Sequence, residues 1–140
     1  MRSYSVAVSA FAIGASRKWL DNVLSHFTIP GIAMEKRGVA RRIPHATLVH
    51  LALARELHTA LAMGVREALQ VASDLLAAEG GVVPAGGHLR VTWDRMTLEV
   101  ELSERLRDAL EFAPMPRRGR PARTGARAGT VNEYGKGGTP

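Results

Sequence analysis

The feature that most restricts the fold is a long run of apolar residues at helical spacing in the middle of the chain. In residues 45–62 leucines and valines recur every three or four positions, which is the period of one face of an α-helix. The same period returns in residues 65–76 after one interruption at Gly64. It ends before the pair Gly80-Gly81, a typical helix stop. Two consecutive helices are therefore predicted, and they make the chain mainly helical.

A shorter pair of helices is predicted at the N-terminus. Residues 5–13 have helically spaced apolar positions, although the alternation of Val6 and Val8 also fits a strand. Gly14 then breaks the pattern, and Ser16 is the candidate cap of a second helix that reaches residue 26. The sequence therefore indicates a short helix, a tight glycine turn and a second helix.

Two small β-hairpins are predicted from alternating apolar positions. The first lies within residues 28–43, and the polar tip of its turn includes a glycine. The second follows a loop at residues 81–88 and pairs residues 89–93 with residues 97–102. A short helix over residues 103–112 completes the folded part. The predicted fold class is mainly α with small β-hairpins, an α+β arrangement.

Charge is distributed unevenly along the 140 residues, which have a net charge of +6. Seven basic and two acidic residues give residues 1–43 a net charge of +5. Six arginines and ten acidic residues give residues 44–113 a net charge of −4. In residues 114–140, six basic residues and one glutamate give +5 again. A polyanion is the expected partner, and it should contact the two ends rather than the middle.

A helix–turn–helix followed by a basic hairpin is typical of proteins that read DNA. An α-helix with its side chains has about the width of the B-DNA major groove, and the start of such a helix contacts bases and phosphates. Asn22 suits adenine, and Arg17 suits guanine or a phosphate. The predicted contact residues are Ser16, Arg17, Lys18 and Asn22 on the helix, and Lys36, Arg37, Arg41 and Arg42 on the hairpin.

Residues 4–79 resemble the MerR-type winged-helix family. The resemblance depends on the order of YSVAVSAFAIGASRKWLDNVL as helix–turn–helix, MEKRGVARRI as wing, and two helices separated by LAMGV. It implies that residues 16–26 form the recognition helix. It also implies wing contacts from Arg37, Arg41 and Arg42. The predicted elements lack the family's long dimerisation helix and the metal-sensing cysteines of several members, so effector sensing is not carried over.

The C-terminal segment is rich in proline, glycine and arginine, and we expect it to be disordered when free. Its stretch PRRGRPAR resembles the AT-hook, in which an extended Gly-Arg-Pro backbone lies in a narrow A·T-rich minor groove. The candidate contact residues are Arg117, Arg118, Gly119, Arg120 and Arg123. The alternatives are a nonspecific cationic tail or a tail that only aids solubility.

Several classes of function lack the residues that they need. The chain has no cysteine, no metal-binding spacing among its five histidines and no catalytic constellation, so we predict no enzyme activity, metal or cofactor. His50 and His58 are interpreted as a surface pair. Trp19 is expected to anchor the second helix, and Trp93 to pack the second hairpin. No apolar window is long enough to cross a membrane, so the expected location is the cytoplasm, at the nucleoid.

Together these features predict a sequence-specific double-stranded DNA-binding protein, a transcriptional regulator of bacterial or phage type. Residues 1–79 would form the MerR-like winged helix-turn-helix domain, residues 80–113 a dimerisation or partner element, and residues 114–140 the basic tail. A homodimer would form through the hairpin edge at residues 89–102. The alternatives are an antitoxin-like or adaptor protein that binds a protein partner through residues 44–113, and an architectural protein of A·T-rich DNA.

Overall fold

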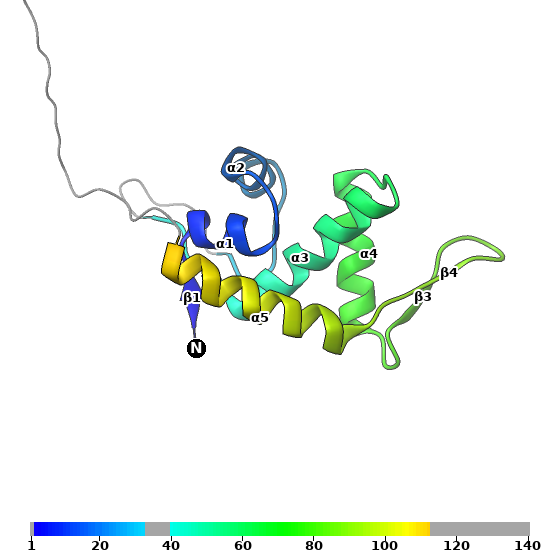
Figure 1. Cartoon of the computed structure of the whole chain (residues 1–140). Helices are drawn as coiled ribbons and strands as arrows, with labels where there is room; N and C mark the ends of the chain where they lie inside the picture. The colour runs from blue at the N-terminus through cyan, green and yellow to red at the C-terminus, as the bar shows by residue number, and fades with distance from the viewer. Residues whose placement is uncertain (1, 33–39, 113–140) are drawn as a thin grey trace, which may run out of the picture.

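The computed structural model describes residues 2–32 and 40–112, and within them it contains five helices and two short antiparallel strand pairs (Figure 1). The helices are α1 Val6–Ala12, α2 Arg17–His26, α3 His45–Ala60, α4 Val65–Ala77 and α5 Arg95–Phe112. The strands are β1 Ser3–Tyr4, β2 Ile43–Pro44, β3 Val82–Pro84 and β4 Arg90–Thr92. The mainly helical α+β class predicted from the sequence is confirmed.

The first two helices begin at the serines that their sequences place there. The Ser5 Oγ accepts a hydrogen bond from the backbone N–H of Val8 at 3.2 Å, and the Ser16 Oγ accepts one from Trp19 at 3.0 Å. Each bond satisfies an N–H group that the first turn of a helix leaves unpaired. Between them the chain turns at Gly14, whose φ of +72° is in the left-handed region that favours glycine.

Helices α3 and α4 pack against each other, and two histidines of α3 contact backbone carbonyl groups, one on α4 and one in the turn that precedes it. The buried His50 ring lies with its Nε2 2.9 Å from the carbonyl oxygen of Leu69, and the His58 Nδ1 lies 2.7 Å from that of Met63. The prediction of a histidine pair on the surface is therefore wrong for His50. The reason is that a histidine on the inner face of α3 can satisfy its ring nitrogen with a backbone carbonyl of α4.

Strand β2 pairs with strand β1 at the N-terminal end of the described residues. Ser3 lies opposite Pro44, and Tyr4 lies opposite Ile43, in an antiparallel register. The prediction placed Ile43 in a hairpin within residues 28–43, whose tip Lys36-Arg37-Gly38 lies outside the described residues. Both Tyr4 and Ile43 are buried, so this pairing places two large apolar side chains in the core.

Helix α5 replaces the second strand of the predicted C-terminal hairpin. Residues 97–102 are helical, and β4 pairs instead with β3, which lies in the segment predicted to be a loop. Asp94 caps the new helix start, because its carboxylate accepts hydrogen bonds from the Thr97 N–H at 3.0 Å and the Thr97 hydroxyl at 2.7 Å. The prediction that residues 97–102 form the second strand of a hairpin is therefore wrong, whereas the predicted helix over residues 103–112 is confirmed as the C-terminal part of the longer α5.

The 18-residue helix α5 lies across α1 and α3 and completes the core (Figure 1). Its inner face places Leu102 and Leu106 in the same buried cluster as the apolar residues of α1 to α4, and Ala109 is also buried. The β3–β4 hairpin extends away from this body at the N-terminal end of α5 (Figure 1). In the part of the chain that the structure describes, no helix has both the length and the hydrophobicity needed to cross a bilayer.

Candidate nucleic-acid interface

Helix α2 has one buried face and one polar exposed face. Its buried residues Leu20, Val23 and Leu24 hold it against the core. On the other side Arg17, Lys18, Asn22 and Ser25 are exposed. We call these four residues the α2 face. Three of the four helix residues predicted to contact DNA thus have exposed side chains on one helix, and the fourth, Ser16, is also exposed but uses its hydroxyl oxygen as the helix cap.

The charges of the α2 face differ in how they are held. The Nε of Arg17 lies 3.8 Å from the carboxylate of Asp21, one turn along the helix, in a pair that is largely exposed to water. Such a pair is weak and can exchange for a phosphate. Lys18 makes no ion pair with a described residue. Lys18 is therefore the more available cation of the two.

Arg41 and Arg42 have different surroundings although they are neighbours in the sequence. The Arg41 Nη2 lies 3.5 Å from the Ser25 Oγ, so this guanidinium lies beside the α2 face. The Arg42 Nη2 donates to the Ser3 carbonyl at 2.8 Å, and its Nε lies 3.4 Å from the Ser3 Oγ. Arg41 thus adds a cation next to α2, whereas Arg42 ties β2 to β1.

Aromatic contacts fix the position of α2 on the rest of the fold. The guanidinium of Arg55 lies over the Trp19 ring, 4.8 Å from its centroid, and the His58 ring stacks at 6.1 Å. At the other end of α2, Arg66 lies over Phe27 at 5.2 Å. Trp19 is half-buried against the core, in agreement with its predicted anchoring role. Its two partners on α3 were not predicted, because nothing in the spacing relates α2 to α3.

The remaining predicted DNA contacts lie outside the described residues. These are Lys36 and Arg37 of the predicted wing, and Arg117, Arg118, Gly119, Arg120 and Arg123 of the tail. Across residues 2–32 and 40–112, no group of three or more histidine, aspartate or glutamate side chains could hold a metal ion. The predicted contacts among the described residues are therefore Ser16, Arg17, Lys18, Asn22, Arg41 and Arg42.

Comparison of the chain with protein-family models, with curated proteins and with solved structures finds no match. The resemblance to the MerR-type family therefore stays a prediction. The evidence on function therefore comes from the arrangement of the α2 face.

Proposed function

We propose that this chain is a double-stranded DNA-binding protein that acts in transcription, with α2 in the major groove. The observation that supports the proposal is the α2 face together with Arg41. A short, capped helix presents two cations in its first turn and an amide near its middle, all with exposed side chains, and a third cation lies beside it. Cations at this end suit phosphates, and Asn22 has the donor and acceptor that adenine requires.

The rest of the fold fits this use of α2. Helix α1 and the Gly14 turn hold α2 at the surface, while Trp19 and Phe27 attach its two ends to α3 and α4 through arginines. A helix fixed at both ends presents its side chains with little loss of conformational freedom on binding. The acidic residues of α5 belong to a different helix from the one that we propose contacts DNA.

Replacing Lys18 with glutamine should weaken binding to duplex DNA roughly fivefold to tenfold at about 0.1 M salt, because one phosphate contact is lost. The slope of log K against log salt concentration should fall by about 0.9. Fluorescence anisotropy with a labelled duplex at several salt concentrations measures both. The matched control is Arg90→Gln on β4, which removes the same charge from an exposed position on the distant hairpin.

Equal effects of the Lys18 and Arg90 substitutions would show that only overall charge matters, and would contradict the role of α2. Absence of binding by the unmodified protein at about 50 mM salt would reject the DNA proposal altogether. Selection of bound duplexes from a random pool separates a regulator from an architectural protein. A defined motif supports the first, and simple A·T enrichment supports the second.

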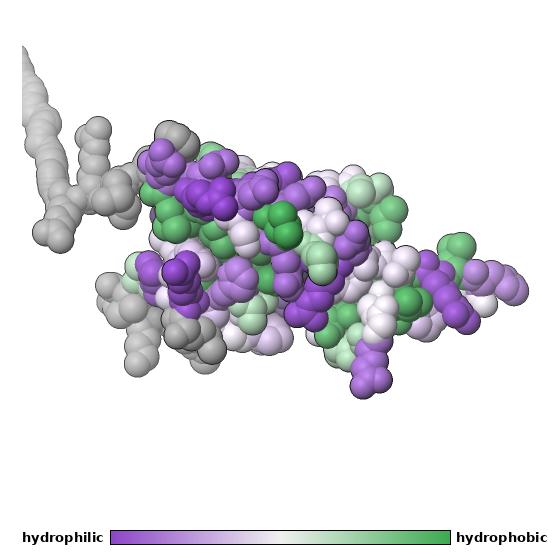
Figure 2. Space-filling view, turned by 60° about the horizontal axis from the view of Figure 1, so that its bottom comes forward, coloured by the Kyte–Doolittle hydropathy of each residue, from purple (hydrophilic) through white to green (hydrophobic). Residues whose placement is uncertain are grey.

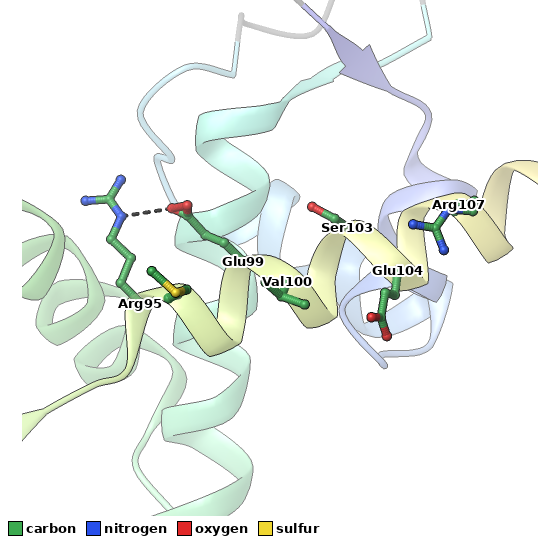
Figure 3. A pocket seen from close by; sticks show the side chains of 7 residues that line it. Arg95, Glu99, Val100, Ser103, Glu104 and Arg107 are labelled. Carbon is green, nitrogen blue, oxygen red and sulfur yellow. Dashed lines mark hydrogen bonds and ion pairs between the residues drawn. The ribbon is translucent and has the colours of Figure 1, made fainter.

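We further propose that two copies pair through the outer face of α5. Three large apolar side chains are exposed there, Met96 at 76%, Val100 at 51% and Leu110 at 60%. With Ser103 and Arg107 they follow the four-three spacing of a helix–helix seam. Figure 3 shows part of this face, and Figure 2 shows hydrophobic patches among hydrophilic residues on the side where α5 lies. An exposed seam of this kind marks an interaction surface.

The charges on this face would be complementary between two copies that pair antiparallel with Ser103 at their two-fold axis. In an antiparallel pair with Ser103 at the two-fold axis, Met96 of one copy lies level with Leu110 of the other, because each is seven residues from the centre. Glu99 and Arg107 are each four residues from the centre, so a glutamate faces an arginine on both sides. This charge complementarity favours a second copy of the chain as the occupant of the face.

Charge reversal tests the pairing. Glu99→Arg alone and Arg107→Glu alone should each weaken the dimer several-fold, because like charges then face each other. The double variant should restore it, and a mixture of the two single variants should form heterodimers. Sedimentation equilibrium measures the dissociation constants, with Asp108→Arg, an exposed change off the seam, as control. A monomer at all concentrations, or no restoration in the double variant, would exclude this dimer without affecting the role of α2.

A further inference from the structure

A cleft lies on the side of α5 opposite the proposed dimer face, where the helix meets α3 and the β3–β4 hairpin. The cleft has a volume of about 400 Å³. Leu53, Leu57 and Leu75 form its floor, and all three are buried. Leu61, just after the end of α3, and Leu98 of α5 also line it, and Leu61 is 57% exposed. A half-open apolar cleft of this size can hold a small organic molecule, since ligand sites begin at about 300 Å³.

Every charged residue that lines this cleft is acidic. They are Glu56 of α3, Asp94 at the start of α5 and Glu101 within α5. None of the three makes an ion pair with a described residue. Hydrogen bonds from the backbone and hydroxyl of Thr97 lower the pKa of Asp94, so this carboxylate stays ionised at neutral pH. Three negative charges beside an apolar wall give the cleft a negative electrostatic potential.

Trp93 contributes an aromatic wall to the same cleft. Its ring lies against Gly81, where a side chain at position 81 would approach the indole nitrogen to 2.9 Å. The guanidinium of Arg95 lies 5.8 Å from the centroid of the ring, so the π system already attracts one cation. Arg95 itself is bound to Glu99 at 2.8 Å and does not line the cleft. The ring therefore supplies an aromatic surface for the apolar body of a ligand.

We propose that this cleft binds a small organic ammonium cation with an apolar or aromatic body. The leucines and Trp93 would contact the body, and the carboxylates of Glu56, Asp94 and Glu101 would surround the ammonium group. The charge pattern excludes an organic anion of the same shape, because it would meet three unpaired carboxylates. This proposal is independent of DNA binding, since no residue of the α2 face lines the cleft.

The test uses two probes of the same length and opposite charge, 4-phenylbutylamine and 4-phenylbutyrate. The chain has two tryptophans, so its two indole N–H signals can be followed in a ¹H–¹⁵N NMR spectrum of the full-length protein. The amine should shift the Trp93 signal saturably and leave the Trp19 signal unchanged. The carboxylate should give no saturable shift. Saturable shifts of equal affinity for both probes, or no shift with the amine, would overturn the proposal.

Two substitutions of Glu101, an exposed residue at the rim of the cleft, test whether its negative charge contributes to binding of the amine. Glu101→Gln should weaken binding of the amine roughly twofold to fivefold, as expected for one partly exposed ion pair. Glu101→Lys should abolish the preference for the amine over the carboxylate. Glu104→Gln is the matched control, because Glu104 is exposed on the same helix but lies outside the cleft. If Glu104→Gln weakened binding as much as Glu101→Gln, the assignment to the cleft would be wrong.

Discussion

Replacing Glu104 with proline is expected to lower the free energy of unfolding by about 3 kcal/mol or more. Glu104 is exposed, so the substitution changes the backbone rather than the core. It lies in the middle of α5, which spans Arg95–Phe112. A proline there removes one backbone hydrogen bond of the helix, and its ring clashes with the carbonyl four residues earlier.

The same substitution distinguishes the observed helix from the one predicted from the sequence. If Ser103 were the N-cap of a short last helix, Glu104 would be the first helical residue, where proline is well tolerated. Urea unfolding followed by far-ultraviolet circular dichroism gives the free energy, and Glu104→Ala is the control for loss of the carboxylate. A loss for the proline variant of less than about 1 kcal/mol relative to this control would contradict a continuous α5.

Helix α5 also shows why part of the fold could not be read from the sequence. Leu98, Val100 and Leu102 alternate as in a strand, yet Leu98, Leu102 and Leu106 equally share one helix face. The choice depends on long-range contacts, because Leu102 and Leu106 are buried in the same cluster as residues of α1 and α3. Local signals succeeded where a cap and a glycine marked the ends, as at Ser16 and Gly14.

The candidate interface could be predicted from the sequence only in part, because local patterns fix some of its features and long-range contacts fix the others. The positions of polar residues on α2 follow from helical spacing alone, so the exposed residues of this helix could be named in advance. The contrast between Arg41 and Arg42 could not, because it depends on pairing between Ser3 and Pro44, which are far apart in the chain. The buried state of His50 similarly depends on a carbonyl from another helix.

Removing the tail, by ending the chain after Ala113, is expected to weaken binding to A·T-rich duplex DNA on the order of 100-fold at about 0.1 M salt. The removed segment carries six basic residues and one acidic residue, and two or three phosphate contacts are enough for a loss of this size. Anisotropy titrations of the full-length and shortened chains at several salt concentrations measure the affinity and its salt slope.

The sequence of the duplex decides between the two modes of tail binding. An AT-hook-like tail should lose much more affinity on A·T-rich than on G·C-rich duplexes, because the narrow A·T groove has the stronger negative potential. The matched variant Arg118→Lys with Arg120→Lys keeps every charge but replaces the guanidinium groups that suit this groove. It should lose most of the A·T preference and little of the salt slope. Equal losses on both duplexes after truncation, with no effect of the lysine variant, would make the tail a nonspecific cation and leave sequence reading to α2 alone.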